Sequence, residues 1–269
     1  MTMPKPFRDL SLKFFQTSQE DGVAVLKLNR PPANAHHLAM IEELGQAVLA
    51  IRFDTSVKAI VMGSASDRFF SAGADIQTIR DEPAEQLGLL SQTSKEVIMQ
   101  MRATPKVYLA AVNGHCMGGG LELALACDLR FAADASYQIG VPEVALGLIP
   151  GEGGTQLLGR ILGTSRALDL MITGRPLTPR EARDLGLLDF LVPPDQLWPE
   201  VREYASRIAK GPARAIGFTK IALTEGVGAP LWTAFAWERE LQNQLFEHPD
   251  CKEGVRAFFE KRAPKFGGA

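Results

Sequence analysis

Residues 107–133 read VYLAAVNGHCMGGGLELALACDLRFAA and carry the strongest indication of the fold class. Residues 107–112 form an uninterrupted apolar run, which is expected of a strand that is covered on both faces. Three glycines at 118–120 then open a helix over residues 121–126, and residues 129–132 form the next strand. A strand, a helix and a strand in this order predict a βαβ unit with parallel strands.

The same alternation continues toward the N-terminus. Expected strands are residues 12–16, 23–28 and 59–62, and expected helices are residues 38–51 and 87–101. Asp21-Gly22 supplies the turn between the first two strands, and Gly63 is expected to end the third. The first part of the chain therefore predicts an α/β fold with a mostly parallel sheet.

The chain changes character after residue 192, where strand signals almost disappear. Expected helices are residues 196–210, 212–224, 231–246 and 252–261. Pro193-Pro194 marks the change, so we expect an α/β core over residues 1–192 and a helical region over residues 193–269. The helical region is rich in aromatic residues, which predicts that it docks on its own core or on a neighbouring subunit.

Composition excludes several classes of function. The 269 residues are 46% hydrophobic and 22% charged with a formal net charge of −2, which favours a soluble globular protein and gives no support to a nucleic-acid partner. No apolar window reaches the length of a membrane span. The three cysteines have no CxxC spacing and the histidines no HExxH pattern, so we expect neither a disulfide framework nor a bound metal. A reducing compartment is expected, either the cytoplasm or, after removal of a transit peptide, the mitochondrial matrix.

The glycine-rich stretch at residues 113–122 predicts a place for an anion. Glycines at a helix start expose unpaired N–H groups beside the positive end of the helix dipole. The spacing is not GxGxxG, and no Lys-Ser/Thr follows, so a dinucleotide or nucleoside triphosphate is poorly supported. An oxyanion hole remains possible for this loop.

Two glutamates are candidates for proton transfer. Glu122 falls in the first turn of the expected helix, where a carboxylate could serve only to complement the dipole. Glu143 is a lone acid in an apolar loop, where it is either exposed or buried with a raised pKa that suits proton transfer. Taken singly, neither residue decides between a structural and a chemical role.

The order and spacing of these segments resemble the enoyl-CoA hydratase/isomerase (crotonase) superfamily over about residues 23–266. The motifs that carry the resemblance are Ser71-Ala72-Gly73-Ala74-Asp75-Ile76, residues 113–122, Pro142-Glu143, Ile149-Pro150-Gly151, Gly153-Gly154-Thr155-Gln156 and Phe258-Phe259-Glu260-Lys261-Arg262. The resemblance implies a β/α spiral core with a helical C-terminal region for oligomerisation. It also implies a homotrimer or a dimer of trimers.

For function, the resemblance implies hydration of a trans-2-enoyl-CoA to a 3-hydroxyacyl-CoA. The backbone N–H groups of Ala74 and Gly119 would bind the thioester oxygen. Glu122 would activate the water, Glu143 would deliver a proton to C2, and Gly151 would help to position the water. The implied CoA-binding residues are Ala33, Ala35, Ala72, Asp75, Ile76, Phe258 and Lys261, the last two partly in the adjacent subunit. No further cofactor is expected, because coenzyme A is part of the substrate.

Two alternatives remain open beside hydration. One is another crotonase reaction on a CoA- or carrier-bound acyl group, such as isomerisation, dehydration or lyase chemistry. The other is a non-catalytic, RNA-binding relative, against which the near-neutral charge argues. Glu152 departs from the family pattern, because many members carry a small residue there. Its carboxylate is expected either to face solvent or to alter the acyl pocket.

Overall fold

The computed structural model describes residues 4–267, and within that range the strands form two sheets. The larger sheet has six strands in the order β1-β2-β3-β5-β7-β9. They are β1 (Phe15–Glu20), β2 (Val23–Leu28), β3 (Ala59–Ser64), β5 (Val107–Val112), β7 (Leu129–Ala133) and β9 (Phe190–Val192). Only the β1–β2 pair is antiparallel, so the predicted, mostly parallel sheet is confirmed.

The second sheet consists of β4 (Phe69–Ser71), β6 (His115–Met117) and β8 (Ile139–Gly140), all parallel. Each of these strands follows a strand of the larger sheet along the chain: β4 follows β3, β6 follows β5 and β8 follows β7. The chain therefore runs through successive turns that add one strand to each sheet, which agrees with the expected spiral core. The small sheet itself was not predicted from the sequence.

Helices lie between and over the strands. The core helices are α1 (Leu38–Phe53), α2 (Ile76–Asp81), α3 (Ala84–Arg102), α4 (Gly119–Ala126), α5 (Gly154–Leu162), α6 (Thr164–Thr173) and α7 (Pro179–Asp184), with 3₁₀ turns η1 (Phe7–Asp9), η2 (Glu143–Leu146) and η3 (Pro194–Gln196). Every residue of α4 is buried, because α3 and α5 pack on it. Its only acid, Glu122, therefore has no route to bulk solvent except through a pocket.

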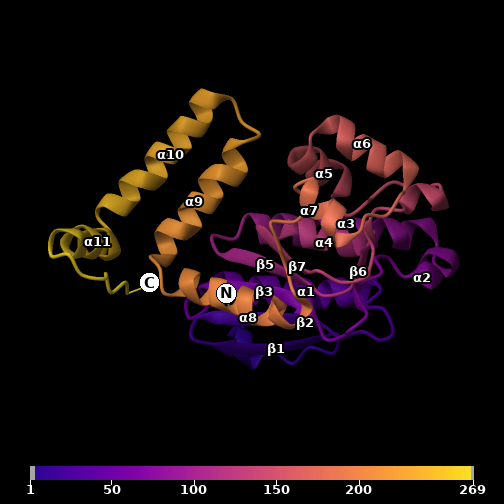
Figure 1. Ribbon diagram of the computed structural model, residues 1–269, viewed down its shortest axis with the longest axis horizontal. Helices are drawn as coiled ribbons and strands as arrows, with labels where there is room; N and C mark the ends of the chain where they lie inside the picture. The colour runs from indigo at the N-terminus through magenta and orange to yellow at the C-terminus, as the bar shows by residue number, and fades with distance from the viewer. Residues whose placement is uncertain (1–3, 268–269) are drawn as a thin grey trace.

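The first C-terminal helix packs on the core, and the later ones lie farther from it. α8 (Leu197–Ala209) packs on β3 and β5 and contributes Leu197 and Val201 to the hydrophobic core. α9 (Ala213–Gly226), α10 (Leu231–Phe246) and α11 (Pro249–Phe259) then extend away from the sheets, with α9 and α10 side by side (Figure 1). The division of the chain at residue 192 stays a prediction, and α8 belongs with the core by its packing.

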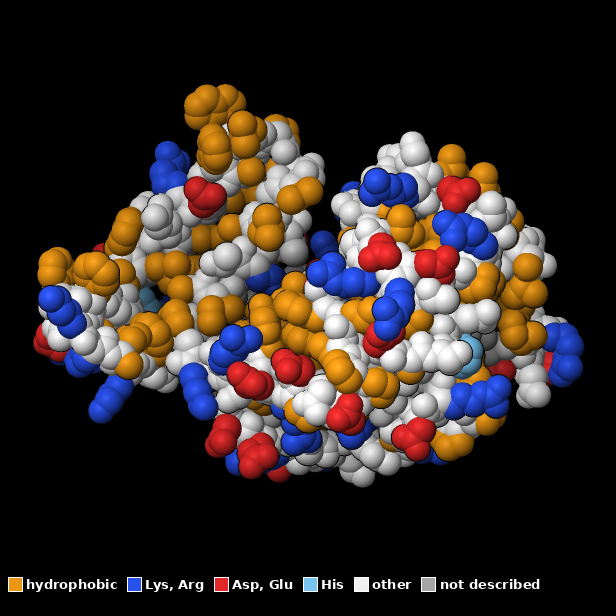
Figure 2. Space-filling model, viewed as in Figure 1, with side chains coloured by type: hydrophobic (Ala, Val, Ile, Leu, Met, Phe, Trp, Pro, Cys, Tyr) orange, Lys and Arg blue, Asp and Glu red, His pale blue; other side chains and the backbone are white. Residues whose placement is uncertain are grey.

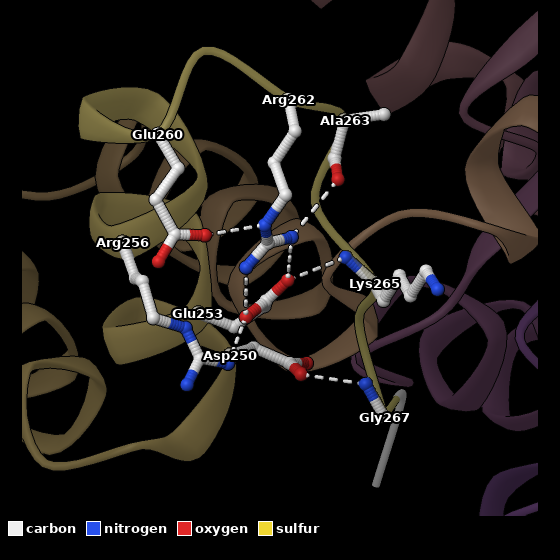
Figure 3. A network of polar contacts seen from close by, with 8 residues as sticks. All are labelled: Asp250, Glu253, Arg256, Glu260, Arg262, Ala263, Lys265 and Gly267. Atoms are coloured by element: carbon white, nitrogen blue, oxygen red, sulfur yellow. Dashed lines mark hydrogen bonds and ion pairs between the residues drawn. The ribbon is translucent and has the colours of Figure 1, made fainter.

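The chain after α11 turns back onto that helix. Glu253 accepts hydrogen bonds from Arg262 Nη1 at 2.6 Å and from the Lys265 N–H at 2.8 Å, and it also pairs with Arg256 (Figure 3). The Gly267 N–H donates to Asp250 Oδ1 at 2.8 Å. The hydrogen bond from Arg262, followed by that from Arg256, lowers the pKa of Glu253. These contacts tie the segment at 262–267 to one face of α11.

Two sequence predictions need correction. The first strand spans β1 and not residues 12–16, because the polar residues 16–20 pair with β2 as an edge strand. β3 does not end at Gly63 but continues to Ser64. Gly63 belongs in this strand because a Cβ there would lie 2.5 Å from the Trp198 ring, which packs over it.

Within residues 4–267, no helix combines the length and the apolar character that crossing a membrane requires.

Candidate active site

Two glycine-rich loops meet at the centre of the site. One joins β4 to α2, and the other joins β6 to α4. A Cβ on Gly73 would lie 2.7 Å from the Met117 oxygen and 2.8 Å from the Gly119 nitrogen, so the loops touch backbone to backbone. Gly73 also has a φ of +83°, which only glycine adopts at low cost. Glycine at position 73 is therefore required by this close approach.

The contact brings two backbone N–H groups to one pocket. Ala74 pairs with His36 as a parallel bridge in which the His36 N–H donates to the Gly73 oxygen and the Asp75 N–H to the His36 oxygen. That pattern directs the N–H of Ala74 away from His36. Gly119 is the first residue of α4, so its N–H has no acceptor within the helix. Ala74 and Gly119 both line the pocket.

The pocket has a volume of about 380 Å³ and a mostly apolar lining. Ile76, Ile79, Leu87 and Leu90 form much of its wall. Among the residues described, three carboxyl groups line it: Glu122, Glu143 and Glu152. Burial in an apolar cavity raises the pKa of an acid, and the like charge of a neighbouring acid raises it further.

Glu122 is held rigidly by backbone groups. Its Oε1 accepts hydrogen bonds from the N–H of Glu152 at 2.8 Å and from the N–H of Gly154, at the start of α5, at 2.6 Å. Burial and then the neighbouring Glu152 carboxylate raise the pKa of Glu122 to about 8. The glutamate that the sequence placed at a helix start therefore faces a cavity and has a raised pKa.

Glu143 approaches from the opposite loop, at the start of η2. Its Oε1 lies 2.7 Å from where a Cβ on Gly118 would be, and Gly118 has a φ of +53°, so glycine is required there on both counts. Its Oε2 is buried and makes no hydrogen bond within the described part of the chain. Burial, with Glu152 nearby, raises the pKa of Glu143. A buried carboxyl oxygen without a partner is suited to bind water or a substrate group.

A buried histidine joins this site without having been predicted to do so. His36 Nδ1 lies 3.1 Å from Glu152 Oε2, and both side chains are buried. The sequence left Glu152 open between solvent and the acyl pocket, and the structure places it in the pocket. The sequence did give a signal for Glu152, because an acid stands where many members of the family have a small residue. His36 gave none, because the two residues lie 116 positions apart.

Comparison with known proteins assigns the family. A model described as enoyl-CoA hydratase/isomerase matches residues 18–269. The chain belongs to this family. It is 38% identical over 252 residues to the crotonyl-CoA hydratase of Syntrophomonas wolfei, covering 92% of this chain and 95% of that protein. It is 35% identical over 252 residues to the 2,3-dehydroadipyl-CoA hydratase of Escherichia coli K12, covering 93% and 97%.

The family fold agrees with a solved structure. A crystal structure of an enoyl-CoA hydratase from Geobacillus kaustophilus HTA426 superposes with a TM-score of 0.95 at 40% identity, covering 97% of this chain and 98% of that one. The resemblance inferred from the sequence motifs and the crotonase-like fold are both confirmed.

Most of the residues expected to bind CoA in this family gather beside the pocket. The Ala72 N–H donates to the Ala33 oxygen at 2.9 Å, and the Ala35 oxygen accepts from Arg30 Nη1 at 2.9 Å, so the segment at 33–35 runs along the first loop. Ala72 and Ile76 line the pocket, and Ile76 is exposed at its edge. These contacts leave the role of the segment in binding CoA as a prediction.

The carboxylate of Asp75 is already engaged within the protein. Its Oδ2 pairs with Arg30 Nη2 at 2.7 Å, and its Oδ1 accepts from the Gln77 N–H to cap α2. Partial burial alone would raise the pKa of Asp75, but the hydrogen bonds from Arg30 and the backbone lower it. Asp75 would therefore contact CoA through its backbone more readily than through its carboxylate.

Phe258 and Lys261 do not join the other expected residues within one chain. α11, which carries Phe258, lies at the opposite end of the molecule from α2, and Lys261 follows that helix (Figure 1). Phe258 is 79% exposed. Gly151, in contrast, lines the pocket, and its oxygen accepts from Ser91 Oγ at 3.1 Å.

Proposed function

We propose that this protein hydrates a trans-2-enoyl-CoA thioester to the 3-hydroxyacyl-CoA. The proposal rests above all on Glu122 and Glu143, which line one pocket with the backbone N–H groups of Ala74 and Gly119. Adding water across a conjugated double bond requires a base, an acid and a site for negative charge. This pocket contains a group suited to each task.

The two backbone donors would stabilise the developing enolate. Attack of water at C3 moves negative charge onto the thioester oxygen, and the N–H groups of Ala74 and Gly119 would bind that oxygen as an oxyanion hole. Donors that are fixed in a water-poor pocket stabilise such charge without reorganising during the reaction. The backbone contact between the two loops at Gly73 supports this role because it fixes both donors.

The two glutamates would handle the protons. Glu122 would accept a proton from the water, and Glu143 would deliver a proton to C2, with Gly151 helping to position the water. Because both carboxyl groups have raised pKa values, the pair retains a proton under conditions where isolated glutamates would not. One ionised and one protonated member is the state that this reaction needs. The chemistry calls for no metal and no cofactor beyond the CoA of the substrate.

The CoA moiety would lie along Ala33, Ala35, Ala72, Asp75 and Ile76. We infer that Phe258 and Lys261 act from a neighbouring subunit, because α11 lies far from the pocket of its own chain (Figure 1). The protein would then work as a homotrimer or a dimer of trimers. Lys261 is a suitable partner for a phosphate of CoA on electrostatic grounds.

A product analysis tests the reaction itself. The relatives include proteins named for crotonyl-CoA and 2,3-dehydroadipyl-CoA, so both are suitable test substrates. Incubation in H₂¹⁸O with crotonyl-CoA should give 3-hydroxybutyryl-CoA that carries one ¹⁸O, and Glu122→Gln should reduce its formation by roughly a hundredfold or more. A product with a shifted double bond, or with a cleaved chain, would favour another reaction of the family and overturn hydration.

A further inference from the structure

His36 and Glu152 lie directly behind the donor loops, where no proton-transfer role has been assigned to either. A Cβ on Gly119 would lie 2.9 Å from both His36 Nδ1 and Glu152 Oε2, so the pair packs against the backbone of this donor. The carboxylate reaches the pocket, and the imidazole is fully buried. A buried acid and a buried base in contact raise the question of where the protons lie.

The hydrogen bonds of Ser71 show which ring nitrogen of His36 carries a proton. Ser71 Oγ lies 2.8 Å from the Asn34 oxygen, which can only accept, so the single hydroxyl proton belongs to that bond. Ser71 Oγ also accepts from the Gly73 N–H at 3.1 Å. His36 Nε2 lies 3.1 Å from the same hydroxyl oxygen, and it must therefore donate. Nε2 carries a proton.

The other ring nitrogen then requires a second proton. If His36 were neutral with its proton on Nε2, its Nδ1 would be a bare acceptor facing the Glu152 carboxylate at 3.1 Å. Two acceptors in contact without a proton repel, so one more proton must lie between them. We assign this proton to the imidazole, because an imidazolium facing a carboxylate forms a charge-assisted hydrogen bond. The pair is then an imidazolium and a carboxylate with no net charge.

The pair also connects the parts of the site. The backbone N–H of Glu152 holds Glu122, its side chain holds His36, and the His36 backbone bonds to the residues on either side of Ala74. A continuous chain of hydrogen bonds thus runs from the Glu122 carboxylate to the loop that carries the Ala74 donor.

We propose that His36 and Glu152 form an imidazolium–carboxylate pair that positions the two backbone donors of the pocket relative to Glu122. Both are positioning residues. His36 does not line the pocket and acts through the loops, and Glu152 acts through its contacts with His36 and Glu122. The kinetic consequence rests on the proposed hydration, whereas the charge state of the pair does not.

Histidine nitrogen NMR tests the charge state on the full-length protein. With ¹⁵N-labelled histidine at neutral pH, wild type should show both ring nitrogens of His36 protonated, with the signals assigned by their loss in His36→Asn. In Glu152→Gln, the side-chain amide can donate to Nδ1, so His36 should become neutral and keep its proton only on Nε2. A neutral His36 ring in wild type, in either tautomer, would overturn the proposal.

Kinetics test the positioning role. Glu152→Ala and His36→Ala should each lower kcat for hydration about tenfold to a hundredfold, with KM changed by less than about threefold, because a misplaced donor acts on the transition state. The double variant should lose little more than either single variant, since one linkage is broken. Glu152→Gln should lose less kcat than Glu152→Ala because its amide maintains the link to His36.

The controls separate the possible failures. His115→Gln removes a histidine of β6 whose Nδ1 accepts from the Gln138 N–H and whose ring packs on Phe69, and it should leave kcat unchanged. Wild-type kcat in both alanine variants would overturn the positioning role, as would single effects that multiply in the double variant. If wild type failed to hydrate any enoyl-CoA, the proposed function would fall, and the NMR result would still decide the charge of the pair.

Discussion

Glu122, Glu143 and Glu152 share one pocket but are held by different means. Backbone N–H groups hold Glu122 in place, and Glu152 contacts His36. Glu143 has a buried oxygen without a hydrogen-bond partner among the described residues. Burial raises the pKa of both Glu122 and Glu143, and the Glu152 charge adds to the effect on each. Interacting acids of this kind lose their protons in steps that belong to the group rather than to single residues.

This titration predicts a bell-shaped pH profile for kcat/KM in hydration. At low pH both glutamates are protonated and no base is available, so activity rises as the pair loses its first proton. At high pH the second proton also leaves the pair, whose raised pKa values include one of about 8, and the acid is lost. The value of kcat/KM should therefore fall above about pH 8. It would be measured over roughly pH 5 to 10, because kcat/KM reports the ionisation of the free enzyme. A flat profile across this range would contradict the assignment.

A second residue-scale prediction concerns Gly119. Gly119→Ala would place a Cβ 2.9 Å from Glu152 Oε2 and from His36 Nδ1, so the donor or the pair must move. Loss of one oxyanion donor costs on the order of a hundredfold in kcat, and we expect a loss of that size. Gly159→Ala on α5 is the matched control, because a Cβ there meets no atom of residues 4–267 within 4 Å. Equal activity of the two variants would argue against the donor role of Gly119.

Part of this site could be predicted from the sequence, and the rest could not because it depends on contacts between distant segments. Ala74, Gly119, Glu122 and Glu143 lie in contiguous motifs, so the resemblance to the family could associate them. The inward orientation of Glu152 depends on how α5 packs on α4. The partner of Glu152 is supplied by a distant loop, and neither fact has a local signature in the chain.

At the scale of elements, long periodic segments were predictable and short ones were not. β5 was predicted with its observed bounds, and α1 within two residues, since each has a sustained apolar pattern. The strands of the small sheet are two or three residues long and show no alternation, so they were missed. The helices α6 and α7 were not predicted either. The small sheet carries the loops of Ala74 and Gly119, so the part of the fold that shapes the pocket was harder to predict from the sequence than the larger sheet.

One buried lysine helps to attach the C-terminal helices to the core. Lys220 of α9 bonds Asp128 Oδ2 at 2.9 Å and the backbone oxygens of Met101 and Lys106 at 3.0 and 2.9 Å. Lys220→Met would leave that carboxylate without its buried cation, which typically costs about 3 kcal/mol or more. We expect a clearly lower midpoint of denaturation. Lys252→Met, at an exposed position of α11, should leave the midpoint unchanged. Equal midpoints for the two variants would contradict the anchoring role.

The whole molecule presents an apolar surface where α10 and α11 leave the core. Figure 2 shows hydrophobic side chains gathered over this extension. Trp232 is 83% exposed, and Phe258 and Phe259 are each 79% exposed. Exposed aromatic residues of this density are typical of surfaces that another protein covers. This surface supports the proposed homo-oligomer, in which α11 of one copy would reach the CoA site of another.

Assembly can be tested by light scattering after size-exclusion chromatography. Wild type should have the mass of three or six copies of the chain. The combined variant Trp232→Glu, Phe258→Glu and Phe259→Glu should shift toward the monomer, because charges oppose burial of the surface. Phe53→Glu on α1, where Phe53 is 48% exposed, should keep the wild-type mass. A monomeric wild type would contradict the assembly and the shared CoA site.

The central claim is that two glutamates hydrate an enoyl-CoA, and one spectrophotometric comparison tests it most directly. The ultraviolet absorbance of the conjugated thioester of crotonyl-CoA would be followed for wild type and Glu143→Gln side by side, with matched folding checked by circular dichroism. The account predicts rapid loss of absorbance with wild type and a rate lower by about a hundredfold or more with the variant. Rates that are equal in the two proteins would contradict the claim.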